Sequence, residues 1–211
     1  MKRTVLALAA AVVLAVSGCA ANANSNSNGS KESAGDTLVA AYSEGGKTLD
    51  PAEANDVTSD TFVLAAYDQL VTYARTEVDG KPKAKTEEIV PMLAESWQAS
   101  ADNTSYTFKL RADAKFQDGS PITADDVVKS FQHIKASSSA SFLYQMAGIA
   151  KVAKVDEHTV TIDLTAPNHL FLQILPMYSF SIIDMDKVAA NGGPKWLATN
   201  TAGSGPYKIT K

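Results

Sequence analysis

The sequence predicts a mixed α and β (α+β) fold, and two patterns carry this prediction. Apolar and polar residues alternate along residues 106–110 and again along residues 160–164, which is the period of half-buried strands. A second pattern has the three- and four-residue spacing of an amphipathic helix, at Val127, Val128, Phe131 and Ile134. We expect this helix to pack on the apolar face of the strands.

The composition is that of a globular protein that works without nucleic acid. Of the 211 residues, 45% are hydrophobic and 20% are charged, which suffices for one good core or two modest ones. The net charge is -4, and no cluster of Lys and Arg offers a phosphate-binding face. We therefore expect no nucleic-acid partner.

The sequence also lacks catalytic and metal-binding patterns. The three histidines, His133, His158 and His169, have no metal-ligand spacing, and no Gly-x-Ser-x-Gly elbow occurs. We interpret His133 and His158 as surface residues and His169 as a helix-start residue. Asp50 is explained by the turn before Pro51. The sequence thus predicts no enzyme, no metal site and no cofactor.

The first residues predict export and a lipid anchor. Two basic residues precede an apolar run over residues 5–16 that is too short to span a bilayer. Residues 16–19, Val-Ser-Gly-Cys, resemble a bacterial lipobox, in which Cys19 is acylated and becomes the first mature residue. Residues 1–18 would then be a signal peptide, and the small polar residues 19–35 a flexible tether. The alternative is an ordinary signal peptide with an incidental cysteine.

The folded region begins after this tether. Residues 37–42 form a short apolar run that predicts a buried strand, and the polar residues 43–46 interrupt it. Residues 60–71 carry apolar side chains at helical spacing and predict an amphipathic helix. The polar residues 72–88 predict an exposed hairpin or loop.

The middle of the chain predicts a turn and a capped helix. Residues 91–97 predict one helical turn that places Trp97 in the core. The Asp-Gly-Ser-Pro sequence at residues 118–121 predicts a tight turn. Thr123, with Asp126 three residues later, then predicts the start of the amphipathic helix.

The last part of the chain adds a hairpin and short elements. Residues 150–155 and 159–164 predict a β-hairpin that joins the earlier strand in one antiparallel sheet. Residues 167–175 predict a short buried helix that begins at a proline. Residues 182–183 predict a strand, and residues 186–190 predict a helical turn.

Four motifs, in order, carry a resemblance to a known family. They are Leu-Ala-Glu-Ser-Trp at residues 93–97, Tyr-Thr-Phe-Lys-Leu-Arg at 106–111, the run from Lys115 to Phe131, and Gly-Ser-Gly-Pro-Tyr at 203–207. Together they resemble the signature of the peptide and nickel type of solute-binding proteins of ABC importers. The resemblance implies a type II periplasmic-binding-protein fold, in which two lobes enclose the ligand and an extra domain is inserted in the first lobe.

The resemblance also implies a division of the chain. Residues 36–49 and 166–211 would belong to the first lobe, and residues 50–165 to the inserted extra domain. In this family the last motif enters a strand of the first lobe, and the second lobe follows it. The chain is therefore expected to be an N-terminal fragment without the second lobe.

In this family, the segment before a Leu-Asp-Pro motif, here residues 49–51, lines the ligand cleft. Glu44 would suit the amino group of a ligand, and the glycines would let a peptide backbone approach closely. The resemblance thus implies a ligand-binding set, which is Ser43, Glu44, Gly45 and Gly46.

The function that the resemblance implies is transport. The protein would be a monomeric, extracytoplasmic receptor, anchored to the membrane through Cys19, that delivers peptides to an ABC permease. A nickel chelate or another solute is an alternative ligand. A lipid-anchored receptor or adhesion protein that has lost transport is another alternative, and a secreted hydrolase on a similar scaffold is disfavoured because no nucleophile with a nearby base is evident.

Overall fold

The computed structural model describes residues 37–210. The chain divides into two units, residues 1–40 and 41–211, and every helix and strand named below lies in the second unit. The expected signal peptide and tether lie outside the described residues. Within residues 37–210, no helix is long and apolar enough to cross a membrane.

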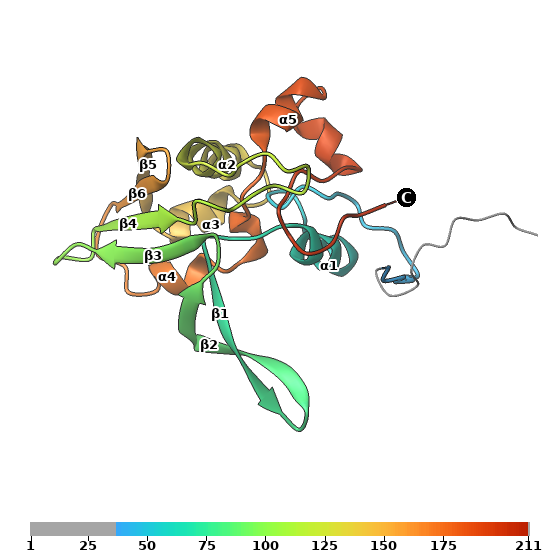
Figure 1. The fold of residues 1–211 in the computed structure, drawn as a ribbon, viewed down its shortest axis with the longest axis horizontal. Helices are drawn as coiled ribbons and strands as arrows, with labels where there is room; N and C mark the ends of the chain where they lie inside the picture. The colour runs from blue at the N-terminus through green and yellow to red at the C-terminus, as the bar shows by residue number, and fades with distance from the viewer. Residues whose placement is uncertain (1–36, 211) are drawn as a thin grey trace, which may run out of the picture. The chain divides into compact units, whose positions relative to one another are not determined.

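A four-stranded antiparallel sheet carries the larger core (Figure 1). In spatial order its strands are β3 (Ala94–Ala99), β4 (Ser105–Leu110), β6 (Thr159–Leu164) and β5 (Ile149–Asp156). Across β4 and β6, Phe108 pairs with Val160 and Tyr106 pairs with Ile162, and all four side chains are buried. The predicted strand, the predicted hairpin and their union in one sheet are confirmed.

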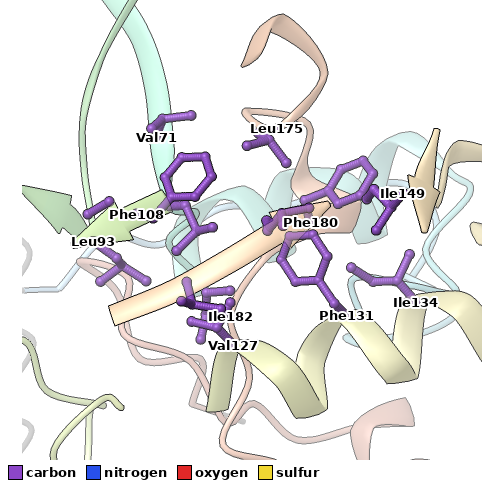
Figure 2. Packing of buried hydrophobic residues seen from close by; sticks show 14 of the residues in the cluster. Val71, Leu93, Phe108, Val127, Phe131, Ile134, Ile149, Leu175, Phe180 and Ile182 are labelled. Carbon is purple, nitrogen blue, oxygen red and sulfur yellow. The ribbon is translucent and has the colours of Figure 1, made fainter. Parts of the chain in front are cut away.

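Helix α2 (Ala124–Ala136) packs against β5 and β6. Figure 2 shows Val127, Phe131 and Ile134 pointing from α2 into the core toward Phe180 and Ile182. At the start of the helix, the carboxylate of Asp126 accepts hydrogen bonds from the backbone N–H and the hydroxyl of Thr123, both at 2.8 Å. The predicted helix, its apolar stripe and its capped start are confirmed.

The polar stretch after residue 71 forms a β-hairpin. A hairpin was one of the two predicted alternatives, and a loop was the other. Strands β1 (Val71–Val78) and β2 (Lys81–Pro91) pair antiparallel, and most of their residues are exposed. The turn places Asp79 at φ 52° and Gly80 at φ 70°, the left-handed conformations that a tight two-residue hairpin requires. Figure 1 shows the hairpin extending away from the four-stranded sheet.

Short helices build a second, smaller core beside the first. Within residues 37–210, the helical elements other than α2 are α1 (Val57–Ala66), α3 (Ser141–Met146), α4 (Phe171–Ile174), η1 (Tyr178–Phe180), α5 (Met185–Ala190) and η2 (Pro194–Ala198). The second core joins α1 to the last part of the chain through Ala54, Val63, Ala66, Tyr67, Ile183, Val188, Leu197 and Ala202. Helix α5 confirms the helical turn predicted at 186–190.

Two predicted elements are wrong. Residues 94–97 belong to strand β3 and not to a helical turn, because their backbone pairs with β4; Trp97 is half-buried against the main core. Residues 37–42 form no strand, and Leu38 and Val39 are 69% and 85% exposed. A strand needs a partner for its backbone groups, and the described residues provide none for this segment.

Two predicted helices have different ends in the structure, and one predicted strand is irregular backbone. The first helix ends at Ala66 and not at residue 71, because Tyr67 turns to an extended backbone with φ -130° and ψ 152°. Helix α4 begins at Phe171 and not at residue 167; the Asn168 side chain instead accepts the N–H of Leu170. Residues 182–183 are buried but form no strand.

Candidate functional site

The predicted ligand segment, residues 43–46, is exposed and irregular. Before it, the ring of Tyr42 meets that of Phe62 on α1 edge to face, with centroids 5.4 Å apart. Among the described residues, no ion pair involves Glu44. A methyl group added at Gly45 would meet no atom within 4 Å. The segment thus presents a carboxylate and an open backbone.

The start of helix α1 fixes the far end of this segment. The backbone N–H of Thr48 donates to the Ser59 hydroxyl at 3.1 Å, and that hydroxyl donates to Asp56 at 2.7 Å. Gly46 lies so close to Ser59 that an added Cβ would be 3.1 Å from its hydroxyl oxygen. The backbone and side-chain hydrogen bonds from Ser59 hold the pKa of Asp56 below its ordinary value.

A buried ion pair lies immediately beyond, at Asp50. The Asp50 carboxylate accepts the backbone N–H of Ala52 at 2.9 Å, so the predicted turn role is confirmed. The same carboxylate lies 2.9 Å and 3.0 Å from Nε2 of His133, whose side chain is only 9% exposed. The prediction that His133 is a surface residue is therefore wrong, because its ring turns inward to pair with this carboxylate.

The end of helix α2 is tied to the same turn through Glu53. Its carboxylate accepts the backbone N–H of Ser138 at 2.9 Å and the hydroxyls of Ser138 and Ser139. Burial alone would raise the pKa of Glu53, but these serine hydrogen bonds together hold it below its ordinary value. The Ser137 hydroxyl donates to the Ala52 carbonyl at 2.7 Å. The residues 50–53 are thus anchored along the last turns of α2.

The Gly-Ser-Gly-Pro motif pairs with the end of α1. The backbone N–H of Gly205 donates to the Ala66 carbonyl at 2.9 Å. The Ser204 hydroxyl donates to Asp68 at 2.9 Å, yet burial raises the pKa of that carboxyl group above its ordinary value. Within the motif, Gly203 lies closest to the end of α1, since a Cβ there would lie 2.2 Å from the Ala66 carbonyl oxygen. The motif therefore crosses the end of α1 at close range.

An acidic groove of about 550 Å³ between α2 and α5 is not a comparable site. Its carboxylates are used locally, because Lys129 pairs with Asp186 at 2.6 Å and Lys187 pairs with Asp118 at 2.8 Å. The hydrogen bond from Lys187 holds the pKa of Asp118 well below its usual range. In the part of the chain that the structure describes, no group of three His, Cys, Asp or Glu side chains could hold a metal.

The family is decided by a match that covers more than half of the chain. The model of the bacterial extracellular solute-binding proteins, family 5 Middle, matches residues 88–211. This chain belongs to that family. Family 5 comprises periplasmic or extracellular binding proteins of ABC transporters and not enzymes, which confirms the predicted resemblance.

Family-5 relatives extend well beyond the length of this chain. The probable D,D-dipeptide-binding periplasmic protein DdpA of Escherichia coli K12 is 37% identical over 180 residues, 82% of this chain and 33% of that protein. MoaA of A. tumefaciens R10, solved with mannopinic acid, is 33% identical with a TM-score of 0.68, over 78% of this chain and 32% of that one. DppA of Helicobacter pylori, solved with the peptide STSA, is 28% identical with a TM-score of 0.66, over 79% and 35%. The chain thus spans about a third of these relatives' length.

Proposed function

We propose that this chain is the N-terminal part of an extracytoplasmic receptor that binds peptides and delivers them to an ABC permease. The observation that carries the proposal is the family-5 match over residues 88–211, together with a dipeptide-binding relative at 37% identity. The exposed segment with Glu44 is followed by Thr48, which hydrogen-bonds to Ser59 of α1 and to the backbone of Asp50, and this exposure with a fixed end supports a ligand contact there. Backbone contacts would give affinity without strict selection among peptides.

The proposed division of the chain follows the expected two-lobed fold. Residues 50–165 would form the inserted domain, and residues 36–49 and 166–211 would form part of the first lobe. The sheet β3–β4–β6–β5 lies wholly within residues 94–164 and so within the proposed inserted domain, whereas both hydrophobic cores also take side chains from residues 166–211. The second lobe would close over the ligand from the other side, burying it between the lobes.

The ligand contact is tested most directly through Glu44. The product of the complete gene that encodes this chain should copurify with peptides, and mass spectrometry after denaturation should identify them. The Glu44→Gln variant should bind the identified peptide at least about tenfold more weakly, because a charge-assisted hydrogen bond to the ligand amino group is lost. Glu77→Gln, on the exposed part of β1, is the matched control. Equal affinity of both variants would remove Glu44 from the site.

The residues 36–211 by themselves should bind peptide poorly. In the proposed fold they supply only one side of the cleft, so a peptide would stay largely exposed to water and lose most of its contacts. Isothermal titration calorimetry with the peptide STSA checks this directly. A dissociation constant in the micromolar range or below would show that this part of the chain holds a sufficient site.

The proposed location is the outer face of the membrane, with Cys19 as the lipid anchor. Two acyl chains on one cysteine would give stable anchoring where one would not. Detergent phase partitioning of the protein made in a bacterial host should place the wild type in the detergent phase and Cys19→Ala in the aqueous phase. A wild-type protein in the aqueous phase would support an ordinary signal peptide.

A solute other than a peptide is the second candidate function. MoaA, solved with mannopinic acid, is 33% identical to this chain, which is more than the 28% of the peptide-bound DppA. The copurification experiment has three other outcomes, which are a solute like mannopinic acid, a nickel chelate, or no solute at all. An empty protein without affinity for peptides would favour a receptor or adhesion role.

A further inference from the structure

His133 and Asp50 form a buried ionisable pair that the fold brings together from distant parts of the chain. The Nε2 atom lies 2.9 Å and 3.0 Å from the two carboxylate oxygens, and the two side chains are 9% and 4% exposed. Because the Asp50 carboxylate also accepts the Ala52 N–H at 2.9 Å, the imidazole completes its hydrogen bonding. Leaving this carboxylate without its partner would be costly in a buried position.

A short chain of contacts connects this pair to the predicted ligand segment. The backbone N–H of Asp50 donates to the Thr48 hydroxyl at 3.1 Å, and the Thr48 N–H donates to Ser59 at 3.1 Å. Ser59 is the residue against which Gly46 packs. Three residues therefore separate Asp50 from the end of the segment, and the middle one, Thr48, lies on this hydrogen-bonded path.

The charges around His133 favour its protonated form. Asp50 and Glu53 face the ring from the turn at residues 50–53. On its own helix, Lys129 is engaged by Asp186 of α5, and Lys135 lies over the ring of Tyr144 from α3. Of the other elements that pack on α2, η1 has no charged side chain, Asp163 of β6 accepts the Ser105 hydroxyl, and Lys154 of β5 pairs with Asp125.

We propose that His133 is a positioning residue: its ion pair with Asp50 holds the base of the segment formed by residues 43–46, and this hold weakens when the imidazole loses its proton. The proposal rests on the proposed function in that residues 43–46 contact the ligand. Burial lowers the pKa of His133, but the hydrogen bond and charge of Asp50 outweigh it, so its pKa lies above the ordinary 6.5. The pair's contribution is therefore complete below pH 6.5 and is lost as the pH rises through the higher folded pKa.

The test needs no ligand, because it measures how strongly the amide groups next to the segment are protected from exchange. Amide hydrogen exchange of Thr48 and Asp50 is measured across this pH range, corrected for the intrinsic rate, and the His133 ring is titrated by NMR in the same samples. The protection of these amides should fall by about fivefold or more, the lower end of ordinary coupling between two sites. The midpoint of the fall should coincide with that of the ring. A fall with a different midpoint, or no fall, overturns the proposal.

Two variants separate the charge of His133 from its shape. His133→Gln keeps a donor near the carboxylate but cannot change its charge, so the protection should become independent of pH. His169→Gln, at an exposed position before α4, should keep the wild-type profile. If His133→Gln does not fold, the coincidence of midpoints in the wild type still decides the question. A pH-dependent profile in folded His133→Gln would overturn the proposal.

A binding measurement distinguishes this inference from the proposed function. With the product of the complete gene and the peptide STSA as probe, affinity should fall over the same pH range in the wild type and stay level in His133→Gln. No STSA binding at any pH argues against the peptide function, and the hold is then judged by hydrogen exchange alone. Binding that ignores pH while the protection falls shows that His133 does not position the ligand segment.

Discussion

Among the glycines that the structure describes, Gly203 lies closest to another part of the chain, which makes Gly203→Ala the sharpest test of the fold. An added Cβ would lie 2.2 Å from the Ala66 carbonyl oxygen and 2.5 Å from Cδ1 of Tyr67, where real contacts stay above 3.0 Å. The backbone segments around Gly203 and Ala66 must then separate by at least 0.8 Å, the difference between 3.0 and 2.2 Å. Overpacking of this kind costs about 1–3 kcal/mol, and weakening the adjacent hydrogen bond between Gly205 and Ala66 adds about 1 kcal/mol.

The total expected loss in the free energy of unfolding is thus about 2–4 kcal/mol. Urea denaturation followed by circular dichroism measures it, and the midpoint should fall by roughly 1 M or more with little change in slope. Gly45→Ala is the matched control, because its added methyl group meets nothing within 4 Å. It should change stability by less than about 0.5 kcal/mol.

The refuting result is equally specific. If Gly203→Ala unfolds at the same urea concentration as Gly45→Ala, the motif does not cross the end of α1 as closely as described. The glycine would then serve some purpose other than close approach.

Other substitutions test the core, a buried hydrogen bond and a perturbed carboxyl group. Phe108→Ala should cost about 3–5 kcal/mol in chemical denaturation, because Phe108 is fully buried, whereas the 60% exposed Phe142 should tolerate alanine with little loss. Ser130→Ala should cost about 1–3 kcal/mol, because its hydroxyl accepts the buried N–H of Ile183 at 2.9 Å; a neutral result would contradict this bond. Since burial raises the folded pKa of Asp68, the wild type loses stability as the pH rises through that pKa. Asp68→Asn should therefore gain stability relative to the wild type as the pH rises above 3.8, the ordinary pKa of Asp, and a difference in unfolding free energy that stays constant with pH would argue against the raised pKa.

The sheet and its helix could be predicted because local pattern and tertiary packing agree there. The alternation around Phe108 and the stripe around Phe131 place the same side chains in the core that the structure buries. Residues 91–97 failed because a short apolar stretch fits a helical turn and a strand equally, and pairing with β4 decides between them. The strand predicted at residues 37–42 was wrong because the sequence shows an apolar run but does not show whether a neighbouring strand is there to pair with it.

The anchors of the ligand segment were harder to predict because they depend on residues far apart in sequence. His133 lies 83 positions from Asp50, and a lone histidine gives no sign of such a partner. One signal was available on α2: Asp126, Ser130, His133 and Ser137 recur at helical spacing beside the apolar stripe. A polar row in that position suggests buried hydrogen bonds and not solvent.

This buried polar row gives α2 two roles that its sequence pattern alone would not separate. Its apolar stripe binds the four-stranded sheet, where shape matters and charge does not. Its polar row instead binds specific chain segments, since Ser130 holds Ile183 and His133 holds Asp50. An apolar contact would tolerate sliding, whereas a hydrogen bond in a buried place fixes one register. Helix α2 therefore ties the turn at residues 50–53, which follows the exposed segment with Glu44, to the four-stranded sheet.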